Sequence, residues 1–333
     1  MSEVILETRS LTKIYDDFIA VDQLSFNVKC GEVFGLLGPN GAGKTTTILM
    51  LLGLTEPTFG SAEIAGLDCS RSTLQIKHVV GYLSDNMGFY PDMTGRENLR
   101  MTGRMNGLSG TRLESRINHL VHRVGIGKAA DKKTGTYSKG MKQRLGIADI
   151  LMKDPDILIM DEPTNGIDPE GMRDLMKLIR ELSELDGKTI LISSHQLHQI
   201  RQICDRVGIF VDGKLVACGT IDELGQQLEL EEGFQWEICL FGNPYKALKP
   251  IKRIKTVTKA MCQDGILYVK ATKDIGTDLL QAVLENDCTI KSFQKTSGDL
   301  DHIYTRYFKK AGENDAVNID KRKRLFSRPH KPN

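Results

Sequence analysis

The first two thirds of the chain alternate short apolar runs with stretches that favour helices. Apolar runs that lack a period of two are typical of parallel strands buried on both faces. Such runs lie at residues 33–37, 79–83, 156–160 and 189–194. Helix-forming stretches lie at residues 46–52, 94–124, 138–152 and 170–185. Strands that alternate with helices in this way predict an α/β fold around a parallel sheet.

Weaker patterns predict further elements in the same region. Short strands are expected at residues 4–6, 24–28 and 62–66, and residues 207–211 and 214–217 form a hairpin across Asp212 and Gly213. Thr94 and Glu97 have the spacing of a capping box at the start of the stretch 94–124. These signals predict further short strands and a mainly helical insertion, which we place at about residues 86–150.

The C-terminal third carries a different and sparser pattern. Possible strands at residues 235–240 and 266–269 and a possible helix near 278–285 predict a small α+β accessory domain. Past residue 310 the sequence turns polar and contains a basic cluster at residues 321–324 together with Arg328. We expect a disordered tail here, and contact with anionic lipid head groups is the alternative. The predicted domains are therefore residues 1–228, 229–310 and 311–333.

Composition narrows the class of protein without deciding it. A chain of 333 residues suits about two domains, and a net charge of +2 gives no reason to expect specific nucleic-acid binding. The seven scattered cysteines favour reduced thiols in the cytoplasm over a disulfide framework or a zinc site. The N-terminus does not read as a signal peptide, and no apolar run is long enough to span a bilayer. A role at a membrane would therefore depend on a partner.

The most specific motif lies directly after the first apolar run. It fits the phosphate-binding pattern G-x-x-x-x-G-K-[ST] with Gly38, Pro39, Asn40, Gly41, Ala42, Gly43, Lys44 and Thr45. Its backbone amides and the following helix N-terminus can hold phosphates, Lys44 can neutralise their charge, and the Thr45 hydroxyl can bind Mg²⁺. The alternative is a glycine-rich turn that caps an ordinary helix. The strand before the motif and the helix after it favour a nucleoside triphosphate site.

Other polar residues follow the later strands of the predicted sheet. Asp161 and Glu162 end one strand, where Asp161 can organise Mg²⁺ and Glu162 can polarise an attacking water. His195 follows the strand at 189–194 and can reach a γ-phosphate from the same sheet edge. Asp85 follows the run at 79–83, where contact with the metal, the water or a partner competes with a simple turn role. Helix capping is the alternative for the paired acids.

Two residues outside these strand ends are also candidates. Ser138 is placed as the N-cap of the helix at 138–152, and such a helix end is a second site for an anion. Tyr15 lies near the predicted nucleotide site and can stack on a purine face, although a packing role is the common alternative for a single tyrosine.

In this order the motifs resemble the ATP-binding subunit of an ABC transporter, over residues 3–225. The resemblance implies a P-loop NTPase core of ABC type with an antiparallel β subdomain and a helical subdomain. It also implies ATP and Mg²⁺ as ligands and assigns most of the candidate residues a role. Tyr15 stacks on adenine, residues Gly38 to Thr46 form the Walker A loop, and Thr45, Asp161 and Asp85 serve the metal. Glu162 is the catalytic base, His195 belongs to the H-loop, and Asp168 belongs to the D-loop. Ser138 and Gly140 of one copy contact the γ-phosphate that the other copy holds.

The sequence departs from the family pattern at two places. The signature, commonly Leu-Ser-Gly-Gly-Gln, reads Tyr137-Ser138-Lys139-Gly140-Met141, a form similar to that of a subgroup of exporter-type subunits. The Q-loop position, commonly Gln after a proline, is Asp85 after Ser84. A shorter, charged group at this position bears on both the metal contact and the coupling to a membrane partner.

The resemblance predicts an ATPase that powers a separate integral-membrane permease, in the direction of export. The segment 298–304 is similar to the closing segment of exporter-type subunits. The expected partners are this permease and a second copy of the chain or a paralogous ATP-binding subunit. The expected location is the cytoplasm, on the inner face of the membrane through the permease. Two alternatives are a soluble ABC ATPase that acts on ribosomes or DNA, and a regulatory nucleotide-binding module with little turnover.

Overall fold

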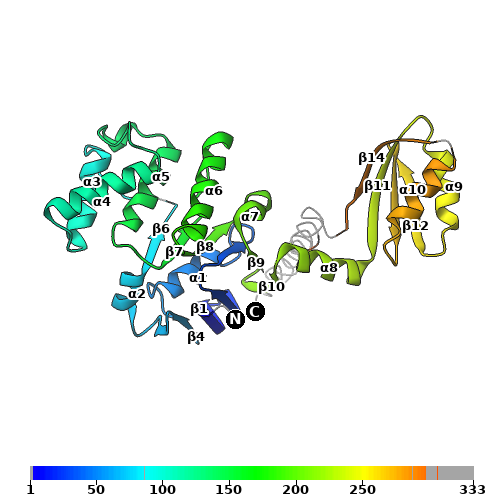
Figure 1. The fold of residues 1–333 in the computed structure, drawn as a ribbon. Helices are drawn as coiled ribbons and strands as arrows, with labels where there is room; N and C mark the ends of the chain where they lie inside the picture. The colour runs from blue at the N-terminus through cyan, green and yellow to red at the C-terminus, as the bar shows by residue number, and fades with distance from the viewer. Residues whose placement is uncertain (1–2, 86, 287, 298–305, 307–333) are drawn as a thin grey trace, which may run out of the picture. The chain divides into compact units, whose positions relative to one another are not determined.

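The computed structural model describes residues 3–85, 87–286, 288–297 and 306, and the chain forms two compact units (Figure 1). The first unit comprises residues 1–218 and the second residues 219–333. The boundary expected from sequence, between residues 228 and 229, lies inside helix α8 (Ile221–Glu232). The segment 298–304 and the basic tail 311–333 lie outside the described residues. No helix in the described part of the chain is long and apolar enough to cross a membrane.

A six-stranded sheet forms the centre of the first unit. Its strands are β3 (Val33–Leu37), β6 (Val80–Leu83), β7 (Ile157–Asp161), β8 (Thr189–Ser194), β9 (Arg206–Val211) and β10 (Lys214–Gly219). They are arranged in the order β10-β9-β3-β8-β7-β6, and the pairs from β9 to β6 are parallel. Every residue of β3, β7 and β8 is buried, as continuous apolar runs predict. Parallel strands bring the ends of β3, β7 and β8 to one edge.

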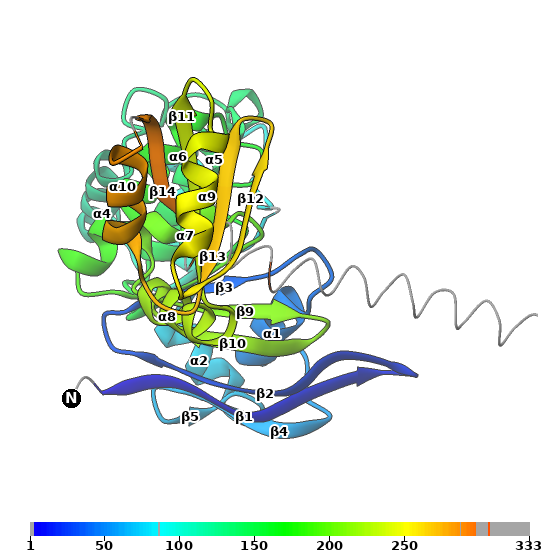
Figure 2. The ribbon, with the colours of Figure 1, turned by 90° about the vertical axis from the view of Figure 1, so that its right-hand side faces the viewer.

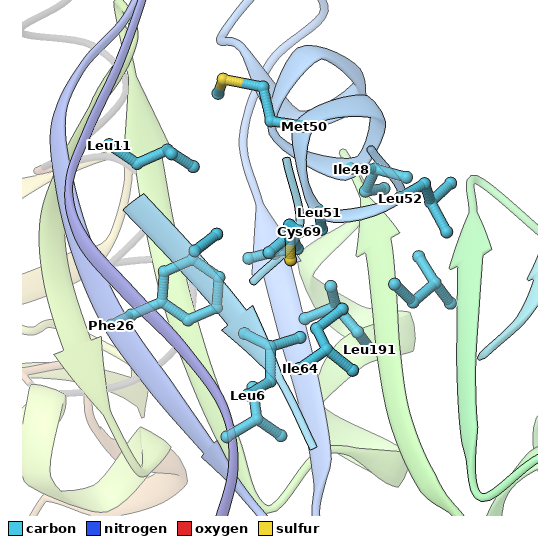
Figure 3. Close-up of a cluster of buried hydrophobic side chains, with 14 of the residues drawn as sticks. Leu6, Leu11, Phe26, Ile48, Met50, Leu51, Leu52, Ile64, Cys69 and Leu191 are labelled. Carbon is cyan, nitrogen blue, oxygen red and sulfur yellow. The ribbon is translucent and has the colours of Figure 1, made fainter. Parts of the chain in front are cut away.

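A second, antiparallel sheet packs against this centre. It consists of β1 (Val4–Tyr15), β2 (Phe18–Lys29), β4 (Phe59–Ile64) and β5 (Leu67–Asp68), in the order β2-β1-β4-β5. Helix α1 (Lys44–Leu51) contributes Ile48, Met50 and Leu51 to a shared core with Leu6 and Phe26 (Figure 3). Because α1 starts at the phosphate-binding motif, burial of its apolar residues fixes the direction of that loop.

The two long strands of this sheet were only partly predicted. The sequence indicated residues 4–6 and 24–28, whereas β1 and β2 each span twelve residues. Their pairing contains register shifts, and Ser10 and Gln23 adopt positive φ angles of 46° and 48°. Such irregularities break the alternation of apolar and polar residues on which a strand prediction depends.

The helical part of the first unit consists of α3 (Gly95–Met105), α4 (Gly110–Arg123) and α5 (Lys139–Leu151), which contact one another. The predicted capping box is present, since the Thr94 hydroxyl accepts from the Glu97 amide and the Glu97 carboxylate accepts from the Thr94 amide. The remaining elements are α2 (Thr73–Val79), the 3₁₀ helix at Thr134–Thr136, α6 (Pro169–Glu184) and α7 (Leu197–Ile203). Val79, predicted as strand, therefore ends a helix.

The second unit is a small α+β domain, as predicted. After α8 come β11 (Phe234–Phe241), α9 (Tyr245–Arg253), β12 (Val257–Gln263), β13 (Ile266–Ala271), α10 (Gly276–Leu284) and β14 (Thr289–Lys295). The antiparallel sheet has the order β12-β13-β11-β14, and α9 and α10 lie on one of its faces (Figure 2). Trp236 and Ile238 of the sheet pack with Ile251 and Leu279 of these helices.

Candidate ATP site

The phosphate-binding motif forms a loop whose backbone is fixed at both ends. Gly41 and Gly43 have φ angles of 83° and 96°, in a region that favours glycine. A Cβ atom on Gly43 would lie 2.5 Å from the Ala20 carbonyl oxygen. The Gly38 amide donates to the Ser194 carbonyl at 3.1 Å, so the loop is tied to the end of β8. The loop therefore presents its backbone amides at a defined place.

Lys44 is buried beneath this loop, with only 5% of its side chain exposed. Its ammonium group donates to the carbonyl oxygens of Gly38 at 2.6 Å and Pro39 at 3.1 Å. It also lies 3.2 Å from Glu162 Oε1. A buried ammonium needs such partners, because desolvation without them is costly. The lysine is thus held at the loop, with an acidic partner nearby.

Asp161, at the end of β7, lies between two hydroxyl groups. The Thr45 hydroxyl donates to Asp161 Oδ2 at 2.9 Å, and the Ser193 hydroxyl donates to Oδ1 at 2.5 Å. One hydroxyl and one carboxylate beside a phosphate loop fit Mg²⁺, which takes few protein ligands and completes its shell with substrate phosphates and water. Among the described residues, no group of three or more His, Cys, Asp or Glu side chains offers a metal site of another kind.

Glu162 follows Asp161 and has a positive φ of 49°, which is uncommon for a residue with a side chain. Its amide donates to the Ser193 hydroxyl at 2.9 Å, and its Oε2 lies 2.8 Å from His195 Nδ1. Oε1 is buried and has no hydrogen-bond partner in the described structure, so its contact with Lys44 is an ion pair only. Oε1 is therefore shielded from solvent while Lys44 lies beside it.

Ser193 was not singled out from the sequence, yet it links both acids. The signal available was a serine pair at the end of an otherwise apolar and buried strand, directly before His195. A buried hydroxyl needs a hydrogen-bond partner. A buried serine at the carboxyl end of a strand therefore indicates a polar side chain on the neighbouring strand.

Ser138, Gly140 and Asp168 lie together at a different place in the first unit. Ser138 caps α5 by accepting from the Met141 amide, and Asp168 caps α6 by accepting from the Gly171 amide at 3.0 Å. All three line one hollow of about 1060 Å³, which no residue of the phosphate loop lines. Two capped helix N-termini thus open onto one space that is separate from the loop of the same chain.

Two further candidates have contacts other than those predicted. Tyr15 ends β1 with 43% of its surface exposed, and the Lys13 ammonium lies 4.9 Å from the centre of its ring. The exposed ring remains accessible to a base, and stacking on adenine stays a prediction. Asp85 Oδ1 accepts from Lys139 Nζ at 3.3 Å. Its predicted role as a metal ligand also remains untested.

Comparison with known proteins agrees with this geometry. A family model described as "ABC transporter" matches residues 21–165. The bacitracin transport ATP-binding protein BcrA of Bacillus licheniformis is 44% identical over 220 residues, which cover 66% of this chain and 71% of that protein. The chain belongs to the ABC transporter family. It is an ATP-binding subunit with ATPase activity, in accordance with Lys44 and Glu162 at the loop.

Other members of the family match more of this chain. The linearmycin resistance ATP-binding protein LnrL of Bacillus subtilis is 38% identical over 302 residues, which cover 90% of this chain and 97% of that protein. The solved structure of cbiO1 from Clostridium perfringens, part of the transporter complex cbiONQ, has a TM-score of 0.62 at 28% identity and covers 68% of this chain. These relatives support transport and give no support to an action on ribosomes or DNA.

Proposed function

We propose that this ABC subunit works as a head-to-tail pair that closes on Mg²⁺ and ATP and drives a separate integral-membrane permease in export. The observation that carries the proposal is the division of its site residues into two groups. Lys44, Asp161 and Glu162 share one sheet edge, whereas Ser138 and Gly140 line a separate hollow. A second copy, or a paralogous subunit, brings the second group to the first.

The first step is the binding of the triphosphate at the loop. Phosphate oxygens replace Glu162 as the partner of Lys44, since they carry more charge and also meet the loop amides. Thr45 and Asp161 would hold Mg²⁺ at this place, and the ion would supply positive charge to compensate the negative charge of the triphosphate. Tyr15 stacks on the adenine. Lys44 thereby exchanges an internal ion pair for the ligand.

Once Glu162 is released from Lys44, its carboxylate retains the contact with His195. His195 Nδ1 faces Glu162 Oε2 at 2.8 Å and fixes the direction of the carboxylate. The released oxygen of Glu162 then orients a water molecule for attack on the γ-phosphate, and His195 is proposed to contact this phosphate. Ser138 and Gly140, at the N-terminus of α5 of the partner, close the site around the γ-phosphate. Asp168 lines the same hollow and positions this face.

The permease is proposed to dock beside the loop that follows β6. A hollow of about 190 Å³ there is lined by Ser84, Met87, Phe89, Asn98, Met101 and Gly146, from this loop, α3 and α5. Aromatic and methionine side chains beside an amide suit an amphipathic segment of a partner. Docking there places the subunit on the inner face of the membrane.

The second unit serves as an accessory domain whose boundary lies near residue 219.

The names of BcrA and LnrL connect those two proteins with bacitracin transport and linearmycin resistance. For this chain they support export, while the cargo is selected by the permease and is not assigned. The proposal requires no specific nucleic acid.

Co-purification tests the proposed partner. The tagged full-length chain, recovered from mildly solubilised membranes of its own host, is expected to bring an integral-membrane protein in a stoichiometric amount. Met101→Lys, in the proposed docking hollow, should lose this protein, whereas Leu185→Lys, an exposed residue just after α6, should retain it. Recovery of ribosomes or nucleic acid in place of a membrane protein would contradict the proposal.

A further inference from the structure

The two departures from the family pattern face each other in the structure. Lys139 replaces a glycine of the signature, and Asp85 replaces a glutamine of the Q-loop. Lys139 Nζ donates to Asp85 Oδ1 at 3.3 Å, and the two side chains are 41% and 39% exposed. The residues are 54 positions apart in the chain, so the fold brings together two charges of opposite sign.

Lys139 also lies against a third loop. A Cβ atom placed on Gly166 would come within 3.2 Å of Lys139 Cδ and 3.3 Å of Nζ, and Gly166 has a φ of 71°. Gly166 belongs to the turn between Glu162 and the Asp168 cap of α6. The stem of Lys139 therefore covers the backbone of the turn that starts at Glu162, and a larger residue at position 166 would displace it.

These contacts matter because Lys139 lies within the signature at the start of α5. Lys139 is the first residue of α5, between Ser138 and Gly140, the pair assigned to the phosphate of the partner. Asp85 directly follows Ser84, which lines the hollow assigned to the permease. Lys139 therefore joins the Asp85 loop to the helix start that carries Ser138 and Gly140.

We propose that Lys139 is a positioning residue, which ties the signature to the Asp85 loop and the Gly166 turn and so makes closure of the ATP dimer depend on the permease side. This inference rests on the proposed function. The ion pair is half exposed, so its effect is modest: loss of either charge should weaken dimer closure roughly two- to fivefold. Loss of the Lys139 charge should leave ATP binding at Lys44 within one copy unchanged.

The test uses the full-length chain in the Glu162→Gln background, which is expected to retain ATP and form a stable dimer. Two quantities are measured: ATP affinity at a protein concentration where the chain is monomeric, and the protein concentration for half-maximal ATP-dependent dimerisation. The variants are Asp85→Asn, Lys139→Gln, their double variant, and the charge exchange Asp85→Lys with Lys139→Asp. Lys139→Arg retains the charge, and Lys132→Gln is the matched control, an exposed lysine before the signature.

Each neutralising variant should weaken dimerisation, and Lys139→Gln should leave monomer ATP affinity unchanged. The double variant should be no worse than either single one, and the charge exchange and Lys139→Arg should recover most of the loss. These differences should shrink in about 1 M salt, where charges are screened within roughly 3 Å. Multiplication of the single effects in the double variant, no loss with Lys139→Gln, or an equal loss with Lys132→Gln would overturn the inference. Failure of Glu162→Gln itself to dimerise would instead contradict the proposed function.

Discussion

At the scale of single residues, Glu162 joins binding to catalysis. Its carboxylate contacts Lys44 through Oε1 and His195 through Oε2, and its positive φ sets the side chain between them. The residue that compensates Lys44 before ATP arrives is thus the one assigned to the attacking water. In the proposed mechanism, binding of the triphosphate therefore also releases the base.

Glu162→Gln should retain ATP binding and lose turnover. Glutamine has nearly the same shape but cannot take a proton, and loss of a positioned base lowers the rate by about 10²–10⁴-fold. ATP affinity should rise slightly, because no carboxylate competes with the phosphates for Lys44. ATP hydrolysis and ATP binding are measured beside Glu184→Gln, a half-exposed acid at the end of α6, which should behave as the natural chain does. Unchanged hydrolysis in Glu162→Gln would refute the assigned base.

Asp149 in α5 predicts a dependence of stability on pH. Burial raises the pKa of Asp149, opposed by a hydrogen bond from Thr102 and by the charge of Lys153. Because its pKa is higher in the folded state, the contribution of this group to stability is complete at low pH. It is lost as the pH rises above the ordinary value of 3.8 and through the folded pKa.

Asp149→Asn should therefore raise the melting temperature at pH 7, with a gain that disappears toward pH 4. Asparagine is neutral throughout and resembles the protonated acid in shape. Thermal unfolding across this range is compared with that of Asp92→Asn, whose carboxylate is 94% exposed and which should show no such trend. A gain that is independent of pH, or a loss at pH 7, would contradict desolvation of the Asp149 carboxylate as the cause.

At the scale of elements, the strength of the local pattern decided what the sequence could predict. β3 and β8 were predicted with their observed bounds, since every residue in them is apolar or small and buried. The hairpin turn at Asp212 and Gly213 was also predicted, and both residues have positive φ, as a two-residue turn requires.

Elements without a clear apolar or periodic pattern in the sequence were not predicted. α9 contains Pro250, which argues against a helix in sequence, and β12 and β14 are half exposed with lysines along them. α8 has a capping box of Thr220 and Glu223, so a local signal was present there. The other elements of the second unit depend on tertiary packing in the core that contains Trp236.

Ser138 has two roles at the start of α5: it caps the helix, and it is assigned to the γ-phosphate of the partner. One substitution separates these roles. Ser138→Asp keeps a good N-cap, so the melting temperature should stay close to that of the natural chain. A carboxylate there should repel the γ-phosphate of the partner and abolish ATP-dependent dimerisation. Ser109→Asp, at the exposed N-terminus of α4, adds the same charge and should leave dimerisation intact. Normal dimerisation by Ser138→Asp would contradict the assigned phosphate contact.

At the scale of the whole molecule, the sequence predicted that Lys44, Asp161, Glu162 and His195 lie at one sheet edge but not how they are linked. The motif residues meet at one sheet edge because the strands before them are parallel, and this followed from pattern alone. The link through Ser193 and the pairing of Asp85 with Lys139 depend on side-chain positions from distant parts of the chain. These contacts have no local signature.

Completion of the ATP site by a second copy can be tested by mixing two inactive variants. Lys44→Ala loses the ammonium that binds phosphate, at a cost of more than about tenfold in ATP affinity, but keeps its Ser138 face. Ser138→Asp keeps the phosphate loop and loses that face. Each variant alone should be inactive.

In a mixed pair, the loop of Ser138→Asp meets the intact Ser138 of Lys44→Ala, which restores one site of two. A site shared between copies predicts that mixing the purified full-length variants recovers part of the natural ATPase rate. A mixture as inactive as its components, although mixed dimers form, would show that each chain needs both groups for itself and that the site is not shared.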